Sequence, residues 1–181
     1  QTHYLKDVMR LKIGDKLSVF NVLGEWNAVI EVYEKKGVKI KILEKVRDKH
    51  NEKNIWLAFS PIKQNPLNFV IQKGTELGVQ RFIPILSERT VVREINTERI
   101  KKIIVEASEQ SNRISVPEIN KTESLKNFLS TFSKNGCLIF CDINSNQKNL
   151  KNILEKKFDG PLCILVGPEG DFSENERKMI I

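Results

Sequence analysis

The stretch that most constrains the fold is a short apolar run followed directly by a glycine turn. Five apolar residues, Leu162 to Val166, precede the tetrapeptide Gly167-Pro168-Glu169-Gly170. An unbroken apolar run of this length beside turn residues predicts a strand buried on both faces, as in a parallel sheet. The glycines and the proline predict a rigid turn that exposes main-chain amides and carbonyls.

A helix is predicted to begin at Ser173, because Glu176 three residues later completes a capping box. A strand, a rigid turn and a capped helix together form a ligand-binding corner at the carboxyl end of a sheet. On spacing alone, an ordinary tight connection between strand and helix has about equal weight. The turn matches neither a dinucleotide fingerprint nor a P-loop. Glu169 also places a negative charge where a bound phosphate would lie.

The composition indicates a globular chain with a basic surface. Lys and Arg number 30 against 23 acidic residues, giving a net charge of +7. Such an excess suits a polyanionic partner, although a solvated lysine-rich surface is the alternative. No apolar run approaches the roughly 20 residues of a membrane span. The polar start of the chain predicts no signal peptide, and we therefore expect a cytoplasmic protein.

The chain has three cysteines, Cys137, Cys141 and Cys163, and each lies in or beside an apolar run. An odd number of such residues indicates reduced thiols that behave as small buried hydrophobes. A catalytic thiol needs a nearby histidine, and the sequence holds only His3 and His50. No set of four residues has the spacing of zinc ligands, so we expect no metal site.

The first 50 residues predict a small β domain. A short helix is expected over His3–Arg10, and three strands over Lys16–Val22, Trp26–Tyr33 and Val38–Leu43. Apolar and polar residues alternate in the last two, which predicts an antiparallel sheet or a small barrel. The charged and polar segment Val46–Asn54 is predicted to mark a domain boundary. The predicted domains are therefore 1–53 and 54–181.

The smaller domain is the more basic one per residue. It carries 12 basic and 8 acidic residues up to Lys53, against 18 and 15 in the rest. Lys39 and Lys41 share one side of a predicted strand, and Arg10 and Lys12 precede the first strand. These four residues predict a face that contacts RNA phosphates. Lysines that protect a sheet edge from aggregation would give the same pattern.

The second domain alternates strands with helices, which predicts a parallel sheet. Strands are expected at 55–60, 81–86, 137–141 and 162–166. One helix is predicted to start at Asn65-Pro66 and end at Gly78, with a buried stripe formed by Leu67, Val70, Ile71, Gly74 and Leu77. Thr97 is expected to cap the next helix. Further helices are predicted around Leu125–Phe132 and Leu150–Phe158.

One helix carries a candidate polar face. Glu106, Gln110 and Arg113 fall at i, i+4 and i+7, so a helix would place them on one side. Glu109 and Arg113 are spaced for an ion pair. A solvated face is the alternative, but an amide and a guanidinium suit directional hydrogen bonding better than the lysine pattern elsewhere.

Four stretches resemble one family, in the same order along the chain. LVGPEGDFSENE closely resembles the signature of the ribosomal RNA small subunit methyltransferase E family, which belongs to the SPOUT superfamily. Asp171 stands where that signature has a second glycine. Three other segments of the family are similar to stretches of this chain, in order HYLKDVMRLKIGD, QKGTELGVQRFIPILSERTVV and EASEQSNRISVPEI.

The resemblance implies a PUA-like β-barrel joined to a SPOUT α/β trefoil-knot domain that works as a homodimer. It further implies binding of S-adenosylmethionine and methylation of uridine N3 in 16S ribosomal RNA of the small subunit. The implied cofactor-binding residues are Cys141, Asp142, Gly167, Pro168, Glu169 and Gly170. The implied catalytic residues are Arg89, Glu106, Gln110 and Arg113. A structural ion pair is the alternative for each arginine.

The resemblance also bears on donor binding and on the alternative functions. The family continues past Ile181 with a segment that threads the knot and closes the cofactor pocket, so we expect the 181 residues alone to bind S-adenosylmethionine weakly or not at all. The alternatives in function are a noncatalytic RNA-binding protein and a SPOUT ribose 2′-O-methyltransferase. The order of the four matching stretches favours the base methyltransferase.

Overall fold

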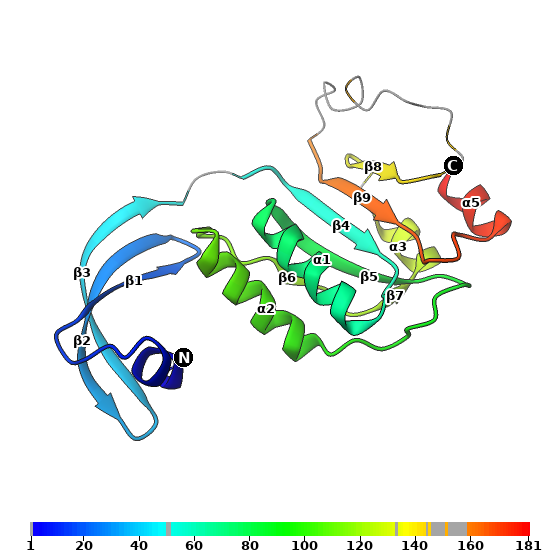
Figure 1. Cartoon of the computed structure of the whole chain (residues 1–181). Helices are drawn as coiled ribbons and strands as arrows, with labels where there is room; N and C mark the ends of the chain where they lie inside the picture. The colour runs from blue at the N-terminus through cyan, green and yellow to red at the C-terminus, as the bar shows by residue number, and fades with distance from the viewer. Residues whose placement is uncertain (1, 50–51, 133, 144, 146–150, 152–158) are drawn as a thin grey trace. The chain divides into compact units, whose positions relative to one another are not determined.

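The computed structural model describes residues 2–49, 52–132, 134–143, 145, 151 and 159–181. The chain forms two compact units, Gln1–Asn51 and Glu52–Ile181 (Figure 1). Each unit contains its own β-sheet structure, so the two are described separately.

The N-terminal unit is a three-stranded antiparallel sheet in the order β1-β2-β3. Its elements are η1 (Tyr4–Val8), β1 (Lys16–Asn21), β2 (Gly24–Glu34) and β3 (Gly37–Asp48). The predicted alternation is confirmed in the middle of β2, where Ala28 and Ile30 are buried and Glu31 is exposed. β3 continues to Asp48, and the two units divide between Asn51 and Glu52, within the predicted boundary segment Val46–Asn54. An ion pair between Arg47 and Glu25 joins β3 to β2 there and stabilises a polar strand end.

The C-terminal unit is built on a parallel sheet, as the alternation of strands and helices predicted. The strand order is β6-β5-β4-β9-β8, and β7 pairs with β5. Its elements are β4 (Ile55–Phe59), α1 (Gln64–Glu76), β5 (Val79–Leu86), α2 (Thr97–Gln110), β6 (Glu118–Ile119), β7 (Glu123–Ser124), α3 (Leu125–Thr131), β8 (Cys137–Phe140), β9 (Leu162–Val166) and α5 (Glu174–Ile180).

Helices pack on both faces of this sheet, because alternate residues of each strand point to opposite sides. One apolar cluster joins α1 and α2 to residues such as Phe59 and Phe82. The other cluster joins α3 to residues such as Ala58 and Leu165, with Phe172 packed among them. The sheet therefore forms the middle layer of the unit (Figure 1).

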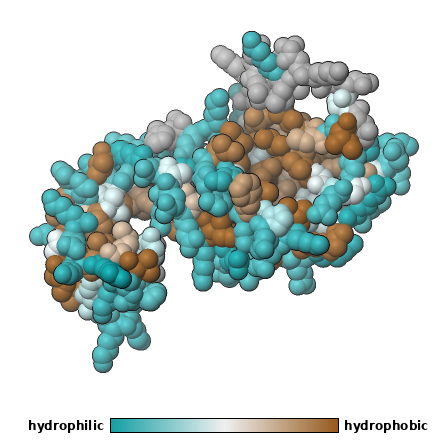
Figure 2. Space-filling model, viewed as in Figure 1, coloured by the Kyte–Doolittle hydropathy of each residue, from teal (hydrophilic) through white to brown (hydrophobic). Residues whose placement is uncertain are grey.

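The prediction that Leu162–Val166 is a strand is confirmed, but it is not buried on both faces. Cys163 and Leu165 are fully buried, whereas Val166 is 40% exposed. The residues of the neighbouring strand β8 are all half-buried. Figure 2 shows an apolar area beside β8 and β9 on the face turned to the viewer.

Two predicted helix starts are wrong by one or two residues. α1 begins at Gln64 after Lys63, whose side chain makes no capping bond, so Asn65 and Pro66 already lie within the first turn. Proline is tolerated there because the first amides of a helix have no partner. α2 is capped by Asn96, whose side chain accepts a hydrogen bond from the amide of Arg99.

The carboxyl end of α1 has the predicted glycine but not the predicted burial of Leu77. Gly78 has φ of +100° just past the C-cap of α1, as expected for a helix-ending glycine. Leu77, predicted in the buried stripe, is the C-cap residue and is 81% exposed. The helix predicted around Leu150–Phe158, including Ile153 and Leu154, lies outside the described residues except for Lys151. In the part of the chain that is described, every helix lacks the length and apolarity needed to cross a membrane.

Candidate functional site

The Gly167 turn (Gly167–Gly170) lies where the strand order of the sheet reverses. The chain runs from β4 outward to β5 and then returns through β8 to β9, which pairs with the other side of β4. At this point the amide of Ser60 donates to the carbonyl of Val166 at 3.1 Å. Ligands in open α/β sheets bind at such a switch point, outside the carboxyl ends of the strands.

Local contacts fix the shape of the Gly167 turn. The amide of Asp171 donates to the carbonyl of Pro168 at 2.9 Å. A Cβ on Gly167 would lie 2.7 Å from the ring of Phe172, so only glycine fits there. Gly170 differs, because a Cβ there would meet nothing nearer than 3.7 Å. Glu169 and Gly170 are exposed, so the turn presents open main chain at this edge of the sheet.

The predicted capping box is present. The hydroxyl of Ser173 accepts from the amide of Glu176 at 3.3 Å, and the carboxylate of Glu176 accepts from the amide of Ser173 at 2.9 Å. The second oxygen of the same carboxylate accepts from the amide of Glu88, in the loop that follows β5, at 2.8 Å. Glu176 therefore connects α5 to a second strand end, a role that the sequence pattern alone did not predict.

Arg89 lies next to the Gly167 turn. Its Nη1 donates to the carbonyl oxygen of Gly170 at 2.7 Å, and the side chain is exposed. Of the four predicted catalytic residues, Arg89 is the one that the structure brings to the turn. Its guanidinium has further N–H groups, which leaves it able to bind a second acceptor.

The loop after β8 lies beside the turn, since β8 pairs directly with β9. The amide of Cys141 donates to the carbonyl of Leu165 at 3.0 Å. Asp142 does not present a free carboxylate, because Arg177 of α5 donates to both of its oxygens, at 2.8 and 2.7 Å. The hydrogen bonds to Asp142 and the negative charge of that carboxylate raise the pKa of Arg177. Asn144, two residues after Asp142, lies outside the described residues.

The three cysteine thiols differ in their burial. Cys163 is fully buried, and burial raises its pKa to about 12, so it is protonated at neutral pH. Cys137 is half-buried, while Cys141 is exposed because the strand ends at Phe140. The prediction of a buried thiol is therefore wrong for Cys141. Among the described side chains, no three His, Cys, Asp or Glu residues form a group that could hold a metal ion.

The predicted polar face of α2 is only partly formed. Glu106 and Gln110 are exposed on the last turns of the helix. The helix ends at Gln110, and Asn112 has φ of +54°, which turns the chain back before Arg113. Arg113 is therefore not on the helix, and the prediction of an ion pair with Glu109 is wrong.

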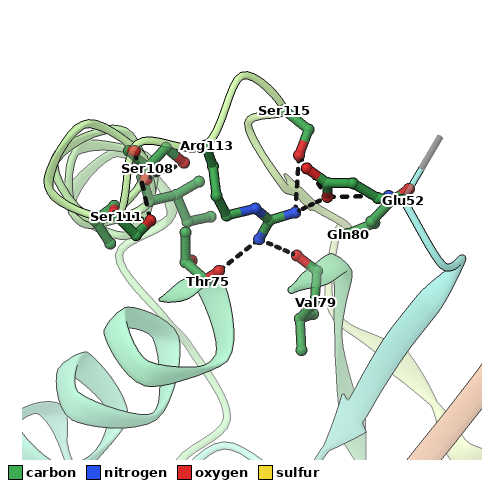
Figure 3. Close-up of polar contacts among 10 residues, drawn as sticks. Glu52, Thr75, Val79, Gln80, Ser108, Ser111, Arg113 and Ser115 are labelled. Carbon is green, nitrogen blue, oxygen red and sulfur yellow. Dashed lines mark hydrogen bonds and ion pairs between the residues drawn. The ribbon is translucent and has the colours of Figure 1, made fainter. Parts of the chain in front are cut away.

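Arg113 is buried at the amino edge of the sheet, the edge opposite the Gly167 turn (Figure 3). Its guanidinium donates to the carbonyl of Thr75 in α1 and to the carbonyl of Val79 at the start of β5, and it forms an ion pair with Glu52 at 2.5 Å. Ser115 and Gln80 donate to the same carboxylate oxygen of Glu52. Within one chain, this geometry favours the structural alternative for Arg113.

The pKa of Glu52 reflects this cluster. Burial raises it, but the hydrogen bonds from Ser115 and Arg113 and the charge of Arg113 outweigh burial and hold it below the ordinary value. The Nε of Arg113 is buried without a hydrogen-bond partner, within the described part of the chain. A buried donor without a partner costs free energy in the folded protein, which offsets part of the stabilisation from the ion pair.

A shallow hollow of about 240 Å³ lies between the amino-terminal halves of α1 and α2. The residues that line it are Ile62, Gln64, Leu67, Asn68, Val92, Glu94, Ile95, Asn96, Arg99 and Ile100. None of the predicted site residues is among them.

The four predicted RNA-contacting residues are all exposed on the N-terminal unit. Lys39 forms an ion pair with Glu34 at 2.7 Å, which offsets part of its charge. Lys41 lies two residues further along β3. Arg10 has φ of +55° and precedes a turn in which the amide of Lys12 donates to the side chain of Asp15.

Comparison with known proteins matches both units. The family described as RNA methyltransferase domain matches residues 49–181, and the family described as RNA methyltransferase PUA domain matches residues 1–43. The ribosomal RNA small subunit methyltransferase E of Rickettsia conorii is 31% identical over 98% of this chain and 73% of its own length. The protein of the same name from Aquifex aeolicus is 31% identical, over 96% of this chain and 76% of its length.

Solved structures match the same span. A ribosomal RNA small subunit methyltransferase E from Neisseria gonorrhoeae, crystallised with S-adenosylmethionine, has a TM-score of 0.83 and 27% identity over 97% of this chain and 74% of its own. A probable rRNA methyltransferase from Porphyromonas gingivalis has a TM-score of 0.83 and 25% sequence identity. The match covers 98% of this chain and 76% of the other. The predicted SPOUT α/β fold with an N-terminal PUA-like unit is therefore confirmed. The chain belongs to the ribosomal RNA small subunit methyltransferase E family.

Proposed function

We propose that this protein uses S-adenosylmethionine to methylate N3 of a uridine in the 16S RNA of the small ribosomal subunit. Family membership supports RNA methylation with this donor. The observation that carries the proposal is the match of almost the whole chain to a relative whose crystal structure contains S-adenosylmethionine. The choice of uridine N3 is the finer part and depends on the test below.

The Gly167 turn fits a methyl donor better than a phosphate ligand. It presents main-chain amides and carbonyls at a switch point, and Gly170 is exposed there. Polar main chain can bind an adenine edge without a charged side chain. We assign the donor contacts to Gly167–Gly170 and to the main chain of Cys141 and Asp142, because the carboxylate of Asp142 is already bound by Arg177.

The chemistry at uridine requires help with a proton. The N3–H group is a weak acid, and only about one in 10² to 10³ is ionised at neutral pH. S-adenosylmethionine, when bound, supplies a methyl group on a positively charged sulfur. Loss of the N3 proton to water or to a base such as Glu106 would allow N3 to bond to that methyl carbon. S-adenosylhomocysteine would then leave with the electrons of the broken carbon–sulfur bond.

Arg89 is the residue we assign to this step. It already donates to the carbonyl of Gly170, and its remaining N–H groups can bind O2 or O4 of uracil. A guanidinium there stabilises the negative charge that develops on the base as the proton leaves. Glu106 and Gln110 stay as candidates that would need the end of α2 to approach the reacting base. Arg113 is the weakest candidate within one chain.

The N-terminal residues 1–53 are proposed to bind RNA through Arg10, Lys12, Lys39 and Lys41, and residues 54–181 to hold the donor. The four side chains are exposed and basic, as phosphate contacts require. We further propose that the protein acts as a homodimer in the cytoplasm, where small subunits are assembled.

The experiment uses the complete gene product, labelled S-adenosylmethionine and small subunits that lack the modification. After digestion of the RNA to nucleosides, label in N3-methyluridine supports the proposal. RNA binding without label transfer would indicate a noncatalytic RNA-binding protein. Label in a product that blocks alkaline cleavage of the backbone would indicate a ribose 2′-O-methyltransferase.

A further inference from the structure

Arg177 joins two loops that follow different strands. From α5 it donates to both carboxylate oxygens of Asp142, at 2.8 and 2.7 Å. The side chains of Arg177 and Asp142 are only 16% and 9% exposed. A two-point arginine–carboxylate pair fixes orientation as well as distance, so the loop after β8 is held in one position relative to α5.

The same guanidinium also reaches the end of the Gly167 turn. Its Nη1 lies 3.5 Å from a carboxylate oxygen of Asp171, while the other oxygen of Asp171 accepts from the amide of Phe172 at 2.8 Å. Asp171 has φ of +60°, a conformation that glycine adopts freely and that most side chains disfavour. Aspartate tolerates it when its carboxylate bonds locally, as it does here.

Aromatic packing links this ion-pair cluster to the turn itself. The guanidinium of Arg177 lies 5.9 Å from the ring centroid of Phe140, and that ring makes an edge contact with Phe172 at 5.5 Å between centroids. Phe172 is buried against Gly167, where a Cβ would come within 2.7 Å of its ring. A shift of Arg177 would therefore be transmitted to both ends of the turn.

We propose that Arg177 is a positioning residue for the methyl donor, holding the Gly167 turn and the loop at Cys141 and Asp142 in register. This inference rests on the proposed function, since it takes the two loops as the donor's contacts. Asp142 acts through this ion pair rather than through a carboxylate contact with the donor. Arg177 also compensates for the aspartate at position 171, where the related signature has glycine.

The test measures binding of S-adenosylhomocysteine to the complete gene product by calorimetry, with donor KM and kcat measured in parallel. Arg177→Ala is expected to weaken binding about tenfold, because a small misplacement of contacting groups costs this much or more. The loss should fall on Kd and KM, with kcat at saturating donor changed less than threefold. Lys178→Ala, an exposed neighbour on the same helix, is the matched control and should bind like the wild type.

A second substitution separates positioning from general damage. Asp171→Gly in the Arg177→Ala background relieves the strain of the positive φ and removes one carboxylate that has lost its ion-pair partner. It should therefore recover part of the lost affinity, while the part that depends on the Arg177–Asp142 pair remains lost. Arg177→Lys, which cannot bind both oxygens in the same plane, should give an intermediate Kd and covers the case in which the alanine variant fails to fold.

The outcomes of this test are distinct. Wild-type affinity in folded Arg177→Ala and Arg177→Lys would overturn the proposal, and so would an affinity loss that Asp171→Gly does not reduce. Failure of the wild-type protein itself to bind S-adenosylhomocysteine would instead count against the proposed function.

Discussion

The carboxylate of Glu176 accepts a hydrogen bond from the main-chain amide of Glu88 at 2.8 Å, across 88 positions of sequence. The same carboxylate completes the capping box of α5 with Ser173. One buried side chain therefore joins the helix after β9 to the loop after β5. Arg89, the next residue in that loop, donates to the carbonyl of Gly170. Two strand ends are thus held together around the Gly167 turn.

Replacement of Glu176 by alanine should lower the free energy of unfolding by about 1–3 kcal/mol, because two partly buried amide hydrogen bonds lose their acceptor. Urea denaturation followed by circular dichroism measures this change. Glu174→Ala, an exposed residue of the same first turn, is the control and should change stability by less than about 0.5 kcal/mol. Equal effects of the two substitutions would contradict the assigned role of Glu176.

The two glycines of the turn should respond differently to alanine. Gly167→Ala forces a Cβ against the ring of Phe172 and should cost about 1–3 kcal/mol of stability. Gly170→Ala meets no close neighbour, so the protein should keep its stability but bind S-adenosylhomocysteine more weakly. Thermal unfolding and calorimetry on both variants check this. Normal donor binding by Gly170→Ala would remove that residue from the proposed contacts.

Arg113→Ala should destabilise the protein by about 3–5 kcal/mol, because it leaves the Glu52 carboxylate without its charge partner. If Arg113 is structural, kcat/KM per folded molecule should stay within about threefold of the wild-type value when measured well below the unfolding temperature. A larger loss of kcat in the folded variant, at unchanged RNA affinity, would restore Arg113 as a catalytic candidate.

The Glu52–Arg113 pair also predicts a pH dependence of stability. The pKa of Glu52 is lowered in the folded protein relative to its ordinary value of 4.5. Its stabilisation is therefore fully present above about pH 4.5 and is lost as the pH falls through the lower folded pKa. Glu52→Gln should make the free energy of unfolding less dependent on pH in this acid range. Identical pH profiles for Glu52→Gln and wild type would contradict the assignment.

The basic face of the N-terminal unit can be tested by charge reversal. Lys39→Glu with Lys41→Glu should weaken binding to small-subunit RNA and flatten its dependence on salt. Of the two single variants, Lys41→Glu should weaken RNA binding more than Lys39→Glu, because Lys39 is already paired with Glu34. Lys121→Glu with Lys126→Glu, two exposed lysines of the other unit, gives the same change in net charge as a control. RNA binding reduced equally by both pairs would show a nonspecific charge effect.

Local sequence signals predicted the features that local interactions determine. The strand at Leu162–Val166 and the capping box at Ser173 depend on neighbouring residues, and both are confirmed. The end of α2 was harder, because it depends on Asn112 adopting a positive φ and on Arg113 finding partners at Glu52 and Val79. Those partners lie far away in sequence, so helical spacing misassigned Arg113.

Around the Gly167 turn, too, the sequence predicted what neighbouring residues determine and missed what distant residues determine. Pro168 and the two glycines marked the turn because they restrict or free the backbone. Arg177 gave no such sign, since its bond to Asp142 exists only after β8 and β9 pair. The aspartate at position 171 was the available signal, because a side chain at a glycine position requires a local compensating contact.

The most direct test of the donor assignment is a crystal structure of the complete gene product with S-adenosylhomocysteine. The expected result is adenosine density against the main chain of Gly167–Gly170, with the Arg177–Asp142 pair intact behind it. Density for the ligand at another edge of the sheet, with the turn empty, would contradict the assignment of the site.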